Sequence, residues 1–306
     1  MSKSPINVVW FKRDLRFTDH EPLYRALEED IPVLLLYFFE PSMISYPDRD
    51  VRHWRFVHES LVEMQGRLED RKGRLYIFHA EVLSVFQALV AHFEIKTIFS
   101  HVEVGNGLSF QRDLEVQGFC QLQKIAWKEA PTGGVIRKLK SRKTWKQRWE
   151  ETMRQTPFLV RETNWNVLQL PPEIYEKLKG PALPIEFSQR NPIFQEGGEY
   201  WAWKYLKGFI ETRHTEYSRS ISKPEASRRA CSRISPYLAY GNLSMRMVYT
   251  YTLQSYETAK NKRSLQNFIS RLHWQGHFIQ KFEDECRVEF EPLNKAYVGQ
   301  IGRAHV

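Results

Sequence analysis

Residues 8–16 read VVWFKRDLR, and in this stretch the pattern of a buried β-strand runs directly into a cluster of charges. Val8 to Phe11 are β-branched and aromatic, which favours a strand, whereas four of the five residues from Lys12 to Arg16 are charged. Charges at the end of a buried strand have three simple explanations. They bind a ligand, they hold the fold together, or they face solvent.

The first 130 residues alternate between strand and helix patterns, which predicts an α/β fold. Continuous apolar runs occur at 6–11, 32–39, 74–79, 96–101 and 121–126, and helical periodicity occurs near 20–29, 51–71, 81–93 and 107–117. Such an order is typical of a doubly wound parallel, Rossmann-like sheet, in which ligands bind at the carboxyl ends of the strands. KRDLR lies at such an end, but no GxGxxG and no P-loop follows the first strand.

The rest of the chain is organised differently. Residues 131–197 predict an interdomain connector with a basic run, RKLKSRKTWKQR at 137–148, and a Pro-containing stretch from Pro157 to Pro192. Residues 198–300 predict the start of an all-helical domain, with helices near 198–210, 224–231, 244–259 and 262–282. The last six residues, IGRAHV, match the translation of a common sequencing adapter. We therefore expect 301–306 to be an artefact and the natural reading frame to be cut near residue 300.

Composition and charge indicate a soluble, globular protein that meets a polyanion. Residues 1–134 carry 16 Lys/Arg against 19 Asp/Glu, and residues 135–306 carry 29 against 17. A basic second half suggests nucleic acid as a partner, with a solvated basic surface as the alternative. The three cysteines match no metal spacing and fit a reducing cytoplasm. No apolar run is long enough for a membrane span.

Two segments of the second half carry candidate chemistry. Cys231, Ser232, Arg233, Ile234 and Ser235 place hydroxyls, backbone amides and a guanidinium at a predicted helix boundary, where they could grip a diphosphate or only cap a helix. In the second segment, FISRLHWQGHF at 268–278, two histidines stand one helical turn apart. The Glu of an HExxH zinc motif and a third ligand are both missing, so no metal site is predicted.

Three motifs in the same order resemble the photolyase/cryptochrome family. VVWFKRDLR resembles its WFRRDLR signature, SRISPYLAYGNLSMR at 232–246 resembles TSxLSPYLxxGxLSxR, and FISRLHWQGHF resembles the FxxELxWREFY helix. The resemblance runs from about residue 6 to 300 and is that of a divergent, bacterial-type member. It implies a helical domain that holds FAD, incomplete in this chain, and a possible antenna chromophore of unknown identity near the strand-end mouth.

The resemblance also implies site residues. Tyr217 and residues 232–235 fall where the family contacts the FAD phosphates, and Cys231 stands where many members have Thr. Phe268 matches an aromatic position beside the flavin. Trp274 matches the tryptophan that lies against a flipped-out pyrimidine dimer, which makes it the candidate catalytic residue.

Three departures from the family pattern bear on the expected activity. Arg271 replaces a Glu that bonds the lesion's base edge, Gln275 replaces an Arg, and Gly276 replaces a second Glu. Arg271 cannot accept a hydrogen bond. We therefore expect Arg271, Trp274 and Gln275 to be the DNA-facing residues, with Arg271 suited to a phosphate contact.

The resemblance implies a blue-light flavoprotein. The leading expectation is a deoxyribodipyrimidine photolyase, a lyase for DNA repair that binds UV-damaged DNA, contacts no membrane and acts as a monomer. The first alternative is a cryptochrome-like photoreceptor without repair activity. The second is a nucleic-acid-binding module that has lost its flavin.

Overall fold

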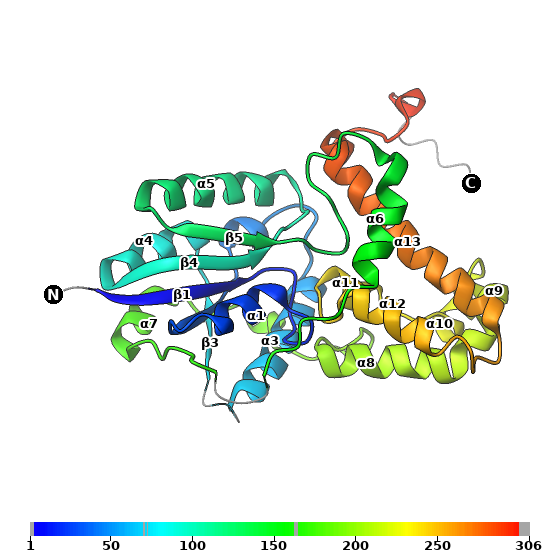
Figure 1. Cartoon of the computed structure of the whole chain (residues 1–306), viewed down its shortest axis with the longest axis horizontal. Coiled ribbons are helices and arrows are strands. Elements are labelled where there is room, and N and C mark those ends of the chain that lie inside the picture. The colour runs from blue at the N-terminus through cyan, green and yellow to red at the C-terminus, as the bar shows by residue number, and fades with distance from the viewer. Residues whose placement is uncertain (1–2, 70, 72, 162–164, 300–306) are drawn as a thin grey trace.

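A five-stranded parallel sheet forms the N-terminal part of the protein (Figure 1). The structure is a computed structural model that describes residues 3–69, 71, 73–161 and 165–299. The strand order is β3-β2-β1-β4-β5. The bounds are β1 Ser4–Phe11, β2 Val33–Phe38, β3 Leu75–Phe78, β4 Phe93–His101 and β5 Ala126–Ala130. The chain leaves β1 towards β2 on one side and later returns to β4 on the other, so the topological switch point lies between β1 and β4.

Helices cover both faces of this sheet, as the doubly wound pattern predicts. One face packs against α4 (Val82–His92), α5 (Gly107–Gln123) and α7 (Pro172–Leu178), and the other against α1 (Glu21–Glu28) and α3 (Val51–Glu69). Side chains alternate along β1, with Val8 and Trp10 in the first core and Val9 and Phe11 in the second. Both faces are apolar because both are covered. A short helix, α2 (Pro41–Ile44), follows β2.

The strand expected at 121–126 is wrong. Helix α5 continues to Gln123 because Val116, Phe119 and Cys120 extend its buried stripe beyond the predicted end at 117. Lys124 then ends the helix in a left-handed conformation, with φ 57°. The fifth strand begins only at Ala126, so the apolar residues before it belong to the end of the helix and the turn.

The second half of the chain is helical. Its helices are α8 (Glu199–Gly208), a π-helical turn (Phe209–Arg213), α9 (His214–Ser220), α10 (Pro224–Ala230), α11 (Ser235–Ala239), α12 (Met245–Gln254) and α13 (Lys262–Asp284). The segment expected to connect the domains contains α6 (Trp145–Met153), which packs on α12 and α13 and joins the helical core. Two 3₁₀ turns, Cys286–Glu289 and Lys295–Tyr297, follow α13. The adapter-like residues 301–306 lie outside the described residues.

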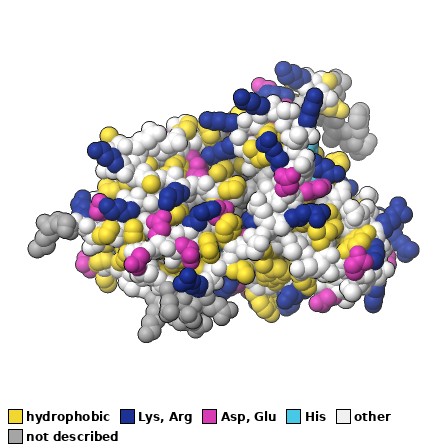
Figure 2. All heavy atoms as spheres, viewed as in Figure 1, with side chains coloured by type: hydrophobic (Ala, Val, Ile, Leu, Met, Phe, Trp, Pro, Cys, Tyr) yellow, Lys and Arg dark blue, Asp and Glu magenta, His cyan; other side chains and the backbone are white. Residues whose placement is uncertain are grey.

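Lys and Arg side chains are unevenly spread over the surface. On the face that Figure 2 shows, several gather where α9 lies and around α6 and the end of α13, while others lie over the α/β domain with Asp and Glu among them. This distribution agrees with the basic second half of the sequence. Among the described helices, none has the length and apolar character that crossing a membrane requires.

Candidate functional site

Charged side chains of the opening segment form ion pairs inside the protein. Lys12 is buried, and its Nζ lies 3.0 Å from Asp113 Oδ2 and 3.7 Å from Glu129 Oε1. The same ammonium group lies 4.4 Å from the centre of the Trp10 ring. A buried, paired lysine of this kind is held by the fold and is not available to a substrate.

Asp14 lies at the centre of a buried cluster with two histidines. Its Oδ2 is 2.9 Å from His20 Nε2 and 2.6 Å from His101 Nδ1, and its Oδ1 accepts a hydrogen bond from the Lys12 backbone N–H. Burial alone raises the pKa of Asp14, but the charge of His20 and the hydrogen bonds of both histidines outweigh it and hold that pKa well below its usual value. Burial lowers the pKa of His101 to about 4. Asp14 is therefore a carboxylate and His101 is neutral near pH 7.

The Asp14, His20 and His101 side chains come together closely enough to suggest a metal site, but their hydrogen bonds argue against one. His20 Nδ1 accepts from the Leu23 backbone N–H and so caps α1. A neutral His20 must then carry its proton on Nε2, the atom that faces Asp14. A metal ion on Nε2 would displace this proton and leave an anionic imidazole ring. The cluster is therefore a hydrogen-bonded network of buried side chains.

The same loop docks the α/β domain onto the helical domain. The Leu15 N–H donates to the Tyr240 carbonyl at 3.0 Å, and Arg16 Nη1 donates to the Gly241 carbonyl at 2.9 Å. Gly241 has φ +71°, and a Cβ there would lie 2.4 Å from the Arg13 carbonyl oxygen. The loop after β1 and the loop before α12 thus touch backbone to backbone. Of the three explanations for the charges of KRDLR, these contacts favour the second, that they hold the fold together.

A second buried network of ion pairs fills the space beside β1 and β2. Arg112 pairs with three carboxylates, those of Glu40 at 2.8 Å, Glu103 at 2.6 Å and Asp113 at 2.8 Å. Despite burial, the Arg112 charge and that of Lys12 lower the pKa of Glu103 to about 2. The cavity left there is only about 50 Å³. Sequence reasoning missed this network, although Glu40 and Glu103 both follow strand ends and α5 carries Arg112.

The predicted phosphate segment forms a tight turn between α10 and α11. Ser232 is nearly buried and Ser235 is exposed. Arg233 adopts a left-handed conformation with φ 60°, and the Gln195 amide donates to its carbonyl at 2.7 Å. Arg213 donates to the Cys231 carbonyl from behind at 3.0 Å. Positive φ is uncommon for residues other than glycine. The residues that do adopt it are often found at functional sites.

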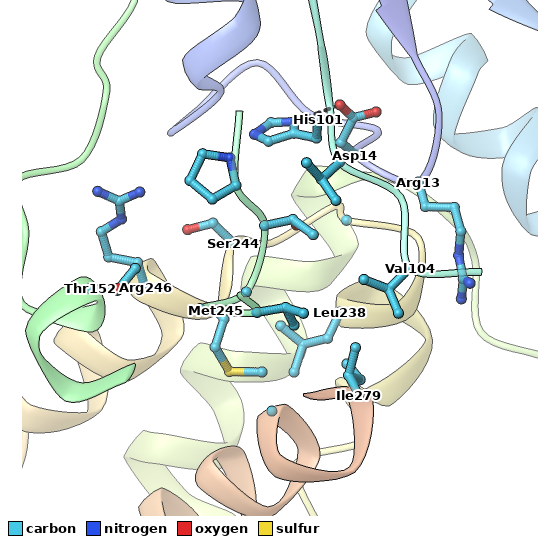
Figure 3. Close-up of a pocket in the computed structure, with 18 of the residues that line it drawn as sticks. Arg13, Asp14, His101, Val104, Thr152, Leu238, Ser244, Met245, Arg246 and Ile279 are labelled. Atoms are coloured by element: carbon cyan, nitrogen blue, oxygen red, sulfur yellow. Dashed lines mark hydrogen bonds and ion pairs between the residues drawn. The ribbon is translucent and has the colours of Figure 1, made fainter. Parts of the chain in front are cut away.

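Phe268, expected beside the flavin ring, and Tyr217, expected at the FAD phosphates, are both buried and lie near each other. Tyr217 and Phe268 have ring centres 6.1 Å apart, and Phe209 lies 4.7 Å from Phe268. Burial raises the pKa of Tyr217 to about 12. The three rings, together with buried Ile234, belong to the helical core. None of these residues lines the interdomain cavity (Figure 3), the space beside β1 and β2 or the groove beside α10.

The three residues predicted to face DNA do not all lie on the same face of α13. Trp274 is 50% exposed, and the Arg271 guanidinium lies 5.3 Å from the centre of its ring. Phe278 continues the exposed stripe, 5.8 Å from Trp274. Gln275 lies on another face and lines the interdomain cavity. The structure therefore groups Arg271 with Trp274 but not with Gln275.

His273 and His277 pack on α6 and do not form a ligand pair. The His273 ring lies 5.1 Å from that of Trp145 and 5.3 Å from that of Trp149, and His277 lies 5.9 Å from Trp145. Gly276 permits this packing because a Cβ there would lie 2.6 Å from Trp149 Nε1. The glycine that replaces the family's Glu is thus where α6 crosses α13.

Comparison with known proteins identifies the lineage. Residues 7–157 match the family model described as DNA photolyase. A cryptochrome DASH of Synechocystis is 25% identical over 97% of this chain, and a deoxyribodipyrimidine photo-lyase of Alkalihalophilus pseudofirmus is 23% identical over 92%. The chain belongs to the photolyase/cryptochrome family. Curated members of this family that match the chain carry both names.

Solved structures of the photolyase/cryptochrome family share the fold. A class III photolyase from Agrobacterium tumefaciens superposes with a TM-score of 0.73 at 18% identity, covering 97% of this chain and 63% of the other. An archaeal photolyase from Sulfolobus tokodaii, whose structure contains two FAD molecules, superposes with a TM-score of 0.70 at 20% identity and is covered to 62%. The two curated relatives are covered to 65% and 60% of their length. The chain thus spans somewhat less than two thirds of these proteins.

An open groove beside α10 carries some of the groups that bind a diphosphate. Arg213, Arg229 and Ser220 line this groove of about 550 Å³, and the carboxylates of Glu216 and Glu225 line it too. The two guanidinium groups and the hydroxyl are groups that bind phosphates, whereas the two carboxylates repel them. Around Phe268, by contrast, the aromatic side chains fill the space themselves. The residues present thus supply cations for the phosphates of FAD, while the rings near Phe268 pack against one another.

Proposed function

We propose that this protein is an FAD-dependent blue-light flavoprotein that repairs UV-induced pyrimidine dimers in DNA. The observation that carries the proposal is the exposed pair of Trp274 and Arg271 on α13, a helix whose buried side carries the predicted flavin residue Phe268. Relatives named deoxyribodipyrimidine photo-lyase support the same activity. The protein would act as a carbon–carbon lyase.

In this proposal the side chains bind and orient, and the cofactor supplies the chemistry. When bound, FAD would supply the light-driven electron transfer that the repair reaction requires. Arg213 and Arg233 would hold the diphosphate in the groove beside α10. Trp274 would stack on the extruded base, because a half-exposed indole offers a flat apolar face. Arg271 would contact a neighbouring phosphate, because a guanidinium only donates hydrogen bonds.

A cryptochrome-like photoreceptor is the second candidate, and the packing of α13 favours it. Gly276 lies against Trp149 with no room for a Cβ, so this surface cannot present the Glu of the family pattern. Arg271 likewise removes an acceptor for the lesion's base edge. Curated relatives named cryptochrome DASH are consistent with this alternative.

The deciding experiment measures repair directly. The protein is reconstituted with reduced FAD and incubated with an oligonucleotide that contains one thymine dimer, under blue light and in the dark. Light-dependent restoration of the intact thymines supports the photolyase. Flavin binding without repair favours the photoreceptor, and DNA binding without flavin favours a module that has lost its cofactor.

An antenna chromophore does not fit the mouth beside β1 and β2. The space there is about 50 Å³ and is occupied by Arg112 and its three carboxylate partners. A second flavin at this position would have to displace the whole buried network. We therefore assign no chromophore to it.

A further inference from the structure

An exposed apolar ridge runs along α5 on the outer side of the α/β domain. Its large members are Phe110, Leu114 and Leu122, whose side chains are 56%, 45% and 78% exposed. Gly118 fills the fourth position of the ridge, because the four residues follow one another at intervals of four along the helix. The opposite face of α5 packs into the core of the domain. In the described part of the chain, nothing covers this ridge.

The surface around the α5 ridge carries almost no charge. Helix α4 packs beside α5 and contains no Lys, Arg, Asp or Glu. In α5, Arg112 and Asp113 are paired in the buried network, and Glu115 accepts a hydrogen bond from the Gln111 amide at 3.3 Å. In Figure 2 the surface over α5 is mostly white and yellow, the colours of uncharged groups. A strongly charged partner would therefore find almost nothing to pair with on this face.

The distribution of charge favours a second copy of this chain as the partner. Residues 1–134 carry 16 Lys and Arg against 19 Asp and Glu, whereas residues 135–306 carry 29 against 17. Two copies that met through their helical domains would bring two basic surfaces together, and like charges repel. Two copies that meet through α4 and α5 join their nearly neutral halves across an uncharged face. Nucleic acid does not suit this face, because α4 and α5 carry no unpaired Lys or Arg.

The geometry of the ridge also suits a copy of itself. Side chains four residues apart form ridges that pack between the same ridges of another helix, with the two axes crossing at about −50°. Two identical helices can cross in this way about a two-fold axis. Gly118 leaves room for the partner's ridge, because nothing lies within 4 Å of a Cβ built there.

The size of the face predicts a weak dimer. Helix α5 is about 25 Å long, and with the shorter α4 beside it the face measures roughly 400–500 Å² on each copy. Stable complexes bury about 1,200 Å² or more over both partners. The two copies should therefore associate and dissociate readily.

We propose that α4 and α5 form the interface of a weak, symmetric homodimer, in place of the monomer expected from the sequence. The α5 ridges of the two copies pack on each other, and α4 of each copy lies at the rim of the contact. Helices α9 and α10 lie on the other side of the molecule (Figure 1), so the dimer leaves the groove beside α10 open. The dimer depends neither on FAD nor on DNA.

Sedimentation equilibrium of the 306-residue chain tests the dimer. The average mass should rise from that of a monomer to that of a dimer with a dissociation constant of roughly 10–100 μM, as a small interface allows. Because the face is uncharged, raising the salt concentration from about 0.1 to about 1 M should not weaken the association. A chain that stays monomeric up to about 1 mM, or a dimer that salt dissociates, would overturn the proposal.

Two matched glycine substitutions locate the contact. Gly118→Arg places a cation in the middle of the α5 ridge, and Gly66→Arg makes the same change on the exposed surface of α3. Nothing lies within 4 Å of a new Cβ at either position, so both variants should fold, which circular dichroism checks. Gly118→Arg should weaken the dimer about 10-fold or more, because two cations would meet across the two-fold axis. Gly66→Arg should dimerise like the unaltered chain. A dimer that persists in Gly118→Arg, or that is lost equally in both variants, would refute the α5 interface.

Discussion

Asp14 and His101, 87 positions apart in the sequence, share a 2.6 Å hydrogen bond between Oδ2 and Nδ1. This bond joins the loop after β1 to the end of β4, the two strands on either side of the switch point. It also lies beside the contact of the two domains, because Leu15 and Arg16 bond to Tyr240 and Gly241. We therefore expect protonation of His101 to weaken the docking of the domains.

Folding stability should fall as the pH drops from about 6.5 to about 4. Burial lowers the pKa of His101 to about 4 in the folded protein, against roughly 6.5 in the unfolded chain. As the pH falls, the unfolded chain therefore binds a proton at His101 before the folded protein does. The stability that neutral His101 contributes is fully present above about pH 6.5 and is lost towards about pH 4. Urea unfolding at a series of pH values measures the slope. His101→Gln should flatten it, whereas His92→Gln, at an exposed position, should leave it unchanged.

Gly241→Ala should destabilise the protein by about 2 kcal/mol or more. The residue has φ +71°, and the new Cβ would lie 2.5 Å from the Asp14 Cα, so the substitution adds backbone strain to overpacking. Gly66→Ala is the control. It lies in the exposed interior of α3 with nothing within 4 Å of the new Cβ and should stabilise by about 0.5–1 kcal/mol. Equal effects of both changes on denaturant unfolding would show that the two loops do not dock as described.

The sheet and most helices follow from local patterns, which is why they could be predicted. The apolar run at 32–39 contains β2, because a strand buried on both faces is apolar throughout. The periodic stretch at 51–71 contains α3, because a helix buried on one stripe repeats its apolar residues about every 3.6 positions. The boundary near residue 123 was missed because a helix end and a strand start are both apolar there. This boundary depends on the left-handed conformation of Lys124, which a lysine in the sequence does not indicate.

The contacts that matter most for the site could not be predicted, because they join residues far apart in the chain. Arg16 and Gly241 are separated by 225 positions, and no periodicity relates them. The same holds for the packing of Trp149 on Gly276, which turns a connector segment into part of the helical core. The exposed stripe of α13 was predictable, since a 3.6-residue period places Arg271 beside Trp274 and away from Gln275.

Trp274→Ala should weaken the binding of dimer-containing DNA about 5- to 150-fold. Stacking of a base on an aromatic ring is worth roughly 1–3 kcal/mol, and 1.4 kcal/mol corresponds to a factor of ten. Trp274 is half-exposed, so its removal should leave stability and flavin content unchanged. Leu122→Ala, which removes an exposed apolar side chain from α5, is the control and should bind DNA normally. Unaltered affinity in Trp274→Ala would remove the basis for DNA stacking.

Arg271→Glu should raise the discrimination between damaged and undamaged DNA while lowering non-specific affinity. The substitution restores the acceptor of the family pattern beside Trp274, and it removes a cation that we expect to contact a phosphate. The loss of one phosphate contact should reduce the slope of log affinity against log salt by about one. The measurement compares the affinities for dimer-containing and intact duplexes at two salt concentrations, with the flavin spectrum recorded in parallel.

Arg263→Glu is the matched control for this change. Arg263 is exposed two turns earlier on α13, so its substitution alters the net charge of the same helix by the same amount. Both variants should bind undamaged DNA less tightly if the helix faces DNA, but only Arg271→Glu should increase the ratio of lesion to intact affinity. If the two variants change both affinities equally, Arg271 acts only as one more surface charge. If neither changes them while the flavin is retained, α13 does not face DNA, and the photoreceptor becomes the better account of this protein.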